Sequence, residues 1–558
     1  ARNVYFNDGS SVRKFGPTTV TLAGLCGLSS SLYPGQAICT TGGLTGLGAT
    51  PTIAANYLLG DTANEVRRNG KLRDRTNALG DIINSTPVIS APTDDFGYRA
   101  LGGTLASSYT AYLNSKRTSK RFMVYAGAND GMLHAFDGGM DGTGAVSGNG
   151  GRETFGYIPA TSYGHMGNLL IPYDPAKVNA QQFSHRYFVD GPLTVADTYY
   201  NDTWNTTLVG STGAGGRGVF ALDVTTPGSF TATNRLWEIN DLSGADAVRA
   251  NIGHVLGKPV IVPVRTLNGG VSWKAIFGNR YSSSSGKAVL FVVDIGNAAT
   301  PTIRMIEATE SNSGIAGSNG LGNIIVLDRL DTANINASTG LPARVRDGYA
   351  DTVYAADLKG AVWKFDLLST ANSVTVPVFT TSTFVQSGAT YRQPITGGLQ
   401  ASAGESGGVL VMFGTGSFSF NDDTLPISST QIQSLYGFND TSNAAVTSTL
   451  TRTSLTPYTV AAGTGGRTLS RGTAPTSARG WYIDLPAGER AVGYPELASG
   501  ILFIPTYTPD SITSGCTAGG GNNLFGLNPR TGGGALSGVR MGSVSGATRV
   551  AGAASMGL

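Results

Sequence analysis

The stretch FMVYAGANDGMLHAFDGG, residues 122–139, decides the fold. Two apolar runs flank the turn-forming triplet Asn129-Asp130-Gly131, and this pattern predicts a β-hairpin. A half-exposed hairpin would alternate apolar and polar residues, but these two strands have almost no polar side. We therefore expect a sheet that is covered on both faces.

The end of this hairpin, LHAFD from Leu133, recurs along the chain. The related pentapeptides share an aliphatic residue (Gly in one copy), a ring, a variable residue, a large apolar residue and a closing Asp or Asn. They are VFALD from Val219, LFVVD from Leu290, VWKFD from Val362, LYGFN from Leu435, GWYID from Gly480 and LFGLN from Leu524. We expect the closing Asp or Asn to accept hydrogen bonds from nearby backbone amides in a strand-ending turn.

The spacing of these pentapeptides indicates a repeat architecture. The seven copies start 86, 71, 72, 73, 45 and 44 residues apart. The last two spacings match one propeller blade of about 40–45 residues, and the longer ones fit a blade with an insertion. Residues 124–137 and 353–366 also align without gaps and share six of fourteen residues. Each blade of a propeller packs against both neighbours, which explains strands that are apolar on both sides.

We therefore predict an all-β chain, a β-propeller of about seven blades with long loop insertions. Six or eight blades are the alternatives, and chance recurrence of short aromatic-aliphatic strings is another. We expect residues 1–80 to be a lead-in segment packed on the propeller, residues 81–545 to be the propeller, and residues 546–558 to be a flexible tail. Within the lead-in, residues 53–74 are the one stretch that favours a helix.

Composition excludes several classes of partner. Charged residues make up 13% of the chain and the formal net charge is +3, which does not favour nucleic acid or an anionic membrane surface. No run of 18 apolar residues occurs, so no membrane span is predicted. The basic stretch 65–75, EVRRNGKLRDR, is interrupted by acids and favours a locally paired loop. The chain starts at Ala1 without a signal peptide, so we expect a mature chain or a fragment.

The three cysteines suggest one disulfide. Twelve residues separate Cys26 from Cys39 in a Gly/Ser/Thr-rich segment, and a bridge there would restrict the unfolded chain. Cys516 is left over in the loop SGCTAGGG. No Cys-x-x-Cys pair or Cys/His cluster occurs, so a structural zinc site is not favoured.

An aspartate-rich stretch indicates a calcium loop. Asp347, Gly348 and Asp351 in DGYAD match the second half of a D-x-D-x-D-G-x-x-D calcium loop. The first and third ligands of that loop would fall on Ala343 and Val345, which have no side-chain oxygen.

An insertion within the loop could have moved its first ligands upstream, away from positions 343 and 345. In that arrangement Asp328 and Asp331 supply the first oxygens, Asp347 and Asp351 the later ones, and Tyr349 contributes its carbonyl. The alternative is an Asx-rich turn without a metal.

Catalytic motifs are weak, and we expect no enzyme. His134 lies on a predicted strand and is expected to be a core histidine bonded to backbone. The chain lacks a G-x-S-x-G elbow at 414–420. The glycines of GAGGRG, from Gly213, precede a predicted strand and not a helix, so dinucleotide binding is not favoured.

Several motifs, in order along nearly the whole chain, resemble the PilC/PilY family of type IV pilus biogenesis and tip-adhesin proteins. They include RDRTNALGDIINSTPVI (73–89), VYAGANDGMLHAFDGG (124–139), RETFGYIPA (152–160), HRYFVDGPLTVAD (185–197), LVGSTGAGGRGVFALDVTTP (208–227), DGYADTVYAADLKGAVWKFDL (347–367), VMFGTGSF (411–418) and RGWYIDL (479–485).

The resemblance implies a modified quinoprotein-like β-propeller forming a carboxy-terminal domain. It also implies an extracellular place at the pilus tip and outer cell surface after export through the periplasm. Expected partners are minor pilins and a host-cell receptor or surface, protein or glycan. The family's calcium loop is tied to pilus extension against retraction and to twitching motility, but only Asp347-Gly348 and Asp351 match it here. No Arg-Gly-Asp triplet occurs, so integrin recognition through that motif is not supported.

Two functional hypotheses remain: a non-enzymatic adhesin and assembly factor, and a quinone-dependent dehydrogenase with the same propeller fold. The second hypothesis is the enzyme. Such an enzyme would need a calcium-bound quinone and an Asp base. Members of that enzyme family often have adjacent cysteines, and no two cysteines are neighbours here. The first hypothesis, a non-enzymatic adhesin and assembly factor, is therefore preferred.

Overall fold

The computed structural model of the chain describes residues 2–545 except for 29–38, 175, 177–181, 267–269, 297–300, 311–312, 330, 336–341, 345, 406–407, 418–430, 442–444, 464–465, 510–519 and 536–543. The chain forms two compact units. Unit 1 contains Ala1–Ser285 and Phe291–Arg304, and unit 2 contains Gly286–Leu290 and Met305–Leu558. Residues 546–558, the predicted tail, lie outside the described residues.

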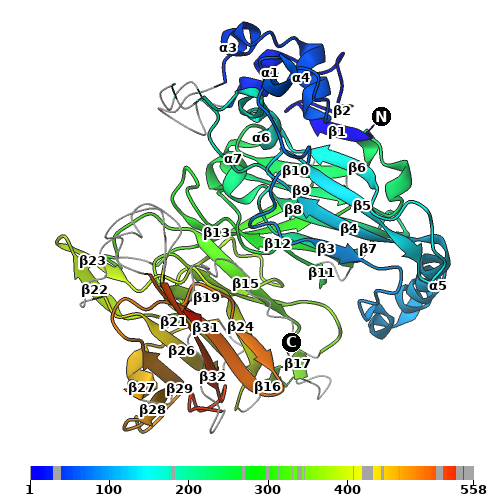
Figure 1. Cartoon of the computed structure of the whole chain (residues 1–558). Helices are drawn as coiled ribbons and strands as arrows, with labels where there is room; N and C mark the ends of the chain where they lie inside the picture. Colours follow the sequence, from blue (N-terminus) through cyan, green and yellow to red (C-terminus); the bar gives the residue numbers. More distant parts are fainter. Residues whose placement is uncertain are drawn as a thin grey trace. The chain divides into compact units, whose positions relative to one another are not determined.

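The described residues contain six sheets of four to six strands (Figure 1). The first has the order β2 (Val12–Lys14), β1 (Val4–Asn7), β6 (Glu153–Ile158), β5 (Leu133–Asp141), β4 (Arg121–Gly127), β3 (Val88–Ser90). The second is β10 (Arg235–Asn240), β9 (Gly218–Asp223), β8 (Thr203–Ser211), β7 (Leu193–Tyr200). The third is β11 (Val260–Arg265), β12 (Val271–Gly278), β13 (Ala288–Asp294), β14 (Ile303–Ala308), β20 (Ser373–Val374).

The remaining three large sheets lie in unit 2. The fourth is β15 (Leu321–Leu327), β18 (Thr352–Asp357), β19 (Ala361–Asp366), β21 (Phe379–Thr380). The fifth is β24 (Leu399–Ala403), β25 (Val409–Gly414), β26 (Ser434–Asp440), β29 (Gly480–Asp484), β27 (Thr456–Gly463), β28 (Gly466–Arg471). The sixth is β30 (Glu496–Ala498), β31 (Ile501–Pro509), β32 (Gly520–Leu527), β33 (Val544–Ser545). Two separate hairpins are β16 (Asp331–Ile335) with β17 (Pro342–Arg344), and β22 (Thr383–Gln386) with β23 (Ala389–Arg392).

The seven pentapeptides all lie on strands, but they mark six sheets. They fall on β5, β9, β13, β19, β26, β29 and β32. The copies at 435 and 480 are antiparallel neighbours in the fifth sheet, where Tyr436 pairs with Tyr482. The described residues thus form six large sheets, which is one of the alternatives left open, because two copies 45 residues apart share one sheet.

The expected strand-ending role of the closing Asp or Asn is confirmed at three copies, and a fourth makes the same bond within a strand. The side-chain Oδ1 atoms accept backbone N–H groups two residues ahead: Gly139 on Asp137 at 2.7 Å, Thr225 on Asp223 at 2.8 Å, Leu368 on Asp366 at 2.9 Å, and Arg530 on Asn528 at 3.0 Å. These bonds satisfy backbone donors at the ends of β9, β19 and β32, whereas Asp137 lies within β5, which continues to Asp141.

The opening hairpin forms as predicted, with β4 and β5 antiparallel and Tyr125 opposite Ala135. One of its faces is fully buried. Tyr125 and Leu133 pack in one core cluster with Leu208 and Phe220 of the second sheet. The other face departs from the prediction, because Val124 is only partly buried and its cross-strand neighbour Ile89 is 64% exposed.

The described residues of the lead-in add two strands and three α-helices to unit 1. β1 pairs in parallel with β6, and the helices are α1 (Leu22–Cys26), α3 (Thr41–Gly46) and α4 (Pro51–Leu58). The helix predicted over 53–74 ends at Leu58, and Gly60 then takes a positive φ of 112°. The prediction of a locally paired loop at 65–75 is confirmed, since Arg67 and Arg75 both contact Glu65, which is fully buried.

The longest helix was not expected from the sequence. α5 (Gly103–Ser119) has 17 residues, many of them Ser and Thr, and Gly102 precedes it without a side-chain cap. Such a segment has a low intrinsic helix preference. Tertiary packing holds it instead, through the buried side chains of Tyr109 and Lys116. The other helices in the described residues are short and include α6 (Ala160–Tyr163) and α7 (Asp246–Asn251). None of the helices that the structure describes is long and apolar enough to cross a membrane.

Candidate functional site

The predicted calcium loop connects two paired strands of unit 2. β15 ends at Leu327 and β18 begins at Thr352, and these two residues are partners in the antiparallel ladder. Asp328 therefore follows the end of one strand while Asp351 precedes the start of the other. The ladder brings the two ends of the aspartate-rich stretch together, although 22 positions separate these residues.

Hydrogen bonds join the two halves of the stretch. Gly348 donates its backbone N–H to Asp328 Oδ2 at 2.8 Å, and Arg329 donates its own to Asp351 Oδ1 at 3.2 Å. Tyr349 donates its N–H to Asp347 Oδ1 at 3.1 Å. This is a closed turn in which backbone amides of one half bind carboxylates of the other.

Asp328 is the residue that best fits a cation ligand. Burial raises the pKa of its carboxyl group, and the charge of Asp347 raises it further, against the Gly348 hydrogen bond and Arg346. Its Oδ1 atom is buried and has no hydrogen-bond partner among the described residues. A bound cation would offset the repulsion between the Asp328 and Asp347 carboxylates and the hydration that buried Asp328 loses.

The other predicted ligands fit less well. Asp351 is 6% exposed, and its Oδ1 also accepts the Thr352 hydroxyl at 2.7 Å. Asp331 lies on β16, and its side chain is outside the described residues, as is Val345. In the part of the chain that the structure describes, no three His, Cys, Asp or Glu side chains are close enough to hold a metal ion.

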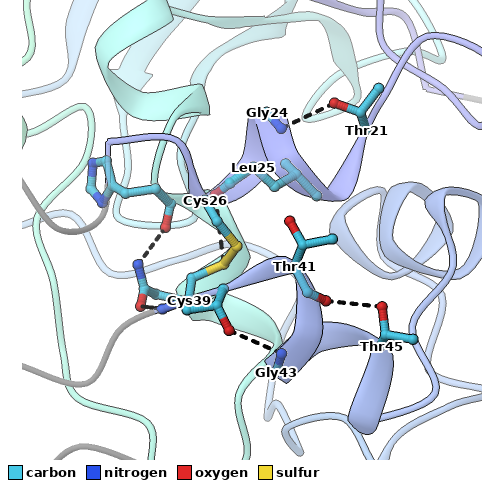
Figure 2. Close-up of a disulfide and its surroundings, with 11 residues drawn as sticks. Thr21, Gly24, Leu25, Cys26, Cys39, Thr41, Gly43 and Thr45 are labelled. Carbon is cyan, nitrogen blue, oxygen red and sulfur yellow. Dashed lines mark hydrogen bonds between the residues drawn. A yellow bond between two sulfur atoms is a disulfide. The ribbon is translucent and has the colours of Figure 1, made fainter.

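The structure joins Cys26 and Cys39 in a disulfide, with their Cα atoms 5.1 Å apart (Figure 2). Cys26 is the last residue of α1, and Cys39 lies shortly before α3, so the bridge ties two short helices together. Threonine caps begin both helices: Thr21 accepts the Gly24 N–H and Thr40 accepts that of Gly43. Cys516 lies outside the described residues.

His134 is a buried histidine, as predicted, but its partners are carboxylates and not backbone. Its Nδ1 lies 2.8 Å from Glu153 and its Nε2 lies 3.1 Å from Asp130. Arg2 binds the same Glu153 through two nitrogens, at 2.5 and 2.6 Å. Burial alone would lower the pKa of His134, but the two carboxylates raise it to about 9. The sequence offered no signal for this network, because Arg2 and Glu153 lie 151 positions apart.

Comparison with known proteins identifies the family. A sequence profile for the PilY1 β-propeller domain matches residues 79–464. The chain belongs to the PilY1 β-propeller domain family. A type IV pilus biogenesis factor PilY1 homolog of Xylella fastidiosa is 36% identical over 532 residues, covering 89% of this chain and 32% of the relative. The type IV pilus biogenesis factor PilY1 of Pseudomonas aeruginosa is 30% identical over 521 residues, covering 86% of this chain and 40% of the relative.

A solved PilY1 structure supports the fold. The crystal structure of the Pseudomonas aeruginosa PilY1 C-terminal domain superposes with a TM-score of 0.56 and 27% sequence identity, covering 80% of this chain and 86% of that one. The chain thus has a propeller-like fold similar to that PilY1 domain, and it is a homologue of type IV pilus biogenesis factors. It spans about a third of the length of these curated relatives, 32% and 40%.

Proposed function

We propose that the chain is the carboxy-terminal propeller domain of a non-enzymatic type IV pilus tip adhesin and assembly factor. Its relatives are named type IV pilus biogenesis factors, and this supports a pilus component as partner. We expect it to bind minor pilins at the tip and a host-cell protein or glycan, on the extracellular side after export through the periplasm.

Pull-down with purified minor pilins tests the pilus role. The chain should retain at least one minor pilin, and an unrelated protein of similar net charge should not. Retention of no minor pilin would contradict the assembly role. Visible absorption with added quinone and calcium tests the non-enzymatic part, which a bound chromophore with alcohol turnover would overturn.

We further propose that the stretch from Asp328 to Asp351 holds Ca²⁺ and links this domain to pilus extension and retraction, and so to twitching motility. The observation that supports it is the buried, unpartnered Oδ1 of Asp328 beside Asp347. Calcium binds six to eight oxygens, so Asp328 and Asp347 would supply carboxylates, and Asp331, the Tyr349 carbonyl and Asp351 are the remaining proposed ligands. The bound ion would neutralise the two neighbouring carboxylates and fix the loop.

Calorimetry with Ca²⁺ on chelator-treated protein tests the loop. Wild type should bind with a Kd on the order of 10⁻⁵–10⁻³ M, and Asp328→Asn or Asp347→Asn should weaken binding at least about tenfold. Asp246→Asn is the matched control, because the Asp246 side chain is 91% exposed. The proposed site would be contradicted if wild type gave no heat of Ca²⁺ binding. It would also be contradicted if wild type and Asp347→Asn gave equal heats.

A further inference from the structure

A cavity of about 270 Å³ lies wholly within unit 1, far from the aspartate-rich stretch in sequence. Its walls come from the end of β3, the last turn of α5, the start of β4, the strands β5, β6 and β8, and residues 224–229 after β9. Ligand sites for drug-sized molecules measure about 300–1,000 Å³, so this cavity suits a ligand of one ring.

Two buried hydrogen-bond donors that line the cavity lack an acceptor among the described residues. Tyr125 is fully buried and its hydroxyl has no partner. Arg121 has a buried Nη2 atom without a partner, and the preceding residue, Lys120, lines the cavity and is partly buried. Burial raises the pKa of Tyr125, so its hydroxyl stays protonated and able to donate. Buried donors without acceptors are costly, and a ligand rich in acceptors would satisfy them.

Ion pairs hold two of the three cations that line the cavity. Lys116 binds Asp197 at 2.8 Å, and Arg121 binds Asp137 at 3.0 Å through its Nε. Lys120 is the remaining cation. Burial lowers the pKa of Lys120, and the nearby charge of Asp223 opposes that shift. One remaining cation matches a ligand with a single negative charge, such as a carboxylate.

Hydroxyl groups make up much of the rest of the lining. Ser90, Thr154, Thr226 and Ser229 line the cavity, and no described side-chain bond uses their hydroxyls. Such groups both donate and accept, so they pair with the hydroxyls of a sugar.

The support beneath the cavity is fixed before any ligand arrives. Asp197 on β7 accepts hydrogen bonds from the Lys116 ammonium and, at 2.9 Å, from the Tyr109 hydroxyl. These bonds hold α5 at two positions that lie about two turns apart. Asp137, the closing residue of the first pentapeptide, orients Arg121 from the facing strand. The donors are therefore held in place, which reduces the entropy lost on binding.

We propose that this cavity binds one carboxylated sugar, a hexuronate residue, with the carboxylate on Lys120, Arg121 Nη2 and the Tyr125 hydroxyl, and the ring hydroxyls on the Ser and Thr side chains. The site does not depend on calcium or on pilin binding, and it stands whether or not the chain acts at a pilus. It assigns a ligand class to unit 1, whereas the aspartate-rich stretch belongs to unit 2.

Calorimetry or saturation-transfer NMR with sodium D-galacturonate on the full chain tests the site. Wild type should bind galacturonate at a millimolar or lower Kd, and neutral D-galactose at least about tenfold more weakly. Lys120→Gln should weaken galacturonate binding at least about tenfold, and Tyr125→Phe should weaken it by a smaller factor. Lys258→Gln is the matched control, since Lys258 is exposed in the same unit, and its affinity should equal that of wild type.

Inorganic phosphate is the discriminating competitor. Weaker binding of phosphate than of galacturonate supports a sugar site, whereas tighter binding of phosphate would replace it with a simple anion site and overturn the proposal. Absence of galacturonate binding, equal affinity for galactose, or unchanged affinity in both Lys120→Gln and Tyr125→Phe would also overturn it. The melting temperature of each variant, compared with wild type, separates lost binding from lost folding.

Discussion

The aligned hairpins β4–β5 and β18–β19 have the same plan but enclose different polar groups. Each strand pair is antiparallel, and each turn has a glycine at positive φ: Gly131 at 100° and Gly360 at 73°. His134 lies between two carboxylates in the first hairpin. Trp363 takes the matching position in the second and donates its Nε1–H to Asp357 Oδ2 at 2.8 Å. Apolar pattern and turn glycine thus specify the hairpin, while the enclosed polar pair is free to change.

The residues just before each hairpin differ in charge. Lys120 precedes the first, Arg121 is the first residue of β4, and both line the unit 1 cavity. Asp347 and Asp351 precede the second and belong to the candidate calcium loop. A repeated strand pair therefore presents cations in one copy and carboxylates in the other, which places our two proposed binding sites at equivalent points of the repeat.

The largest expected difference between the hairpins comes from their turn glycines. A Cβ on Gly360 would lie 2.5 Å from the backbone oxygen of Gln393, whereas on Gly131 it would meet the flexible Met166 side chain at 2.6 Å. We expect Gly360→Ala to cost about 4 kcal/mol and Gly131→Ala about 2 kcal/mol, as backbone strain plus overpacking. Urea unfolding followed by tryptophan fluorescence measures both. Equal costs would mean that the two turns are not packed as described.

The pH dependence of stability separates the hairpins next. The pKa of His134 is raised to about 9 in the folded chain. Its stabilisation is therefore complete below the unfolded value of about 6.5 and is lost as pH rises through about 9. We expect wild type to lose on the order of 2 kcal/mol between pH 6.5 and 9.5 relative to His134→Gln.

The second hairpin provides the control for that titration. Trp363→Phe removes no titrating group, so the variant should keep the wild-type slope of unfolding free energy against pH. A slope unchanged in His134→Gln would show that the two carboxylates do not hold a proton on the imidazole.

A comparison of two tryptophans, with an expected difference of about 1 kcal/mol, tests the indole hydrogen bond. Asp357 is 1% exposed, and Trp363→Phe deprives its carboxylate of one donor while Ala361 N–H and Asn319 remain. The cost should be about 2 kcal/mol, typical of a lost bond to a charged group. Trp481→Phe is the matched control, since the Trp481 Nε1–H donates to the neutral Pro529 carbonyl at 2.7 Å. We expect that variant to lose about 1 kcal/mol, and a reversed order would contradict the role of Asp357.

Much of the fold could be predicted because the repeat is local. Val353, Tyr354 and Phe365 are readable as strand residues from neighbours within fourteen positions. The sheet count was less accurate, because nothing local distinguishes GWYID on β29 from a pentapeptide that starts its own sheet. The helix α5 was missed, because the ion pair of Lys116 with Asp197 joins residues 81 positions apart.

The candidate sites were predictable only where their residues are close in sequence. Asp347, Gly348 and Asp351 form a recognisable motif, and Asp328 could be added because an insertion was assumed. The cavity beside Lys120 gave no sequence signal, since Tyr125, Thr206 and Ser229 meet only through the pairing and packing of two sheets.

An anomalous difference map from crystals grown with calcium tests the proposed cation site. That site lies just before the hairpin β18–β19. We predict one strong peak about 2.3–2.6 Å from Asp328 Oδ1 with Asp347 as a further ligand, and none beside Lys120 and Arg121. Well-ordered Asp328 and Asp347 side chains without a peak, or a peak elsewhere on the chain, would contradict it.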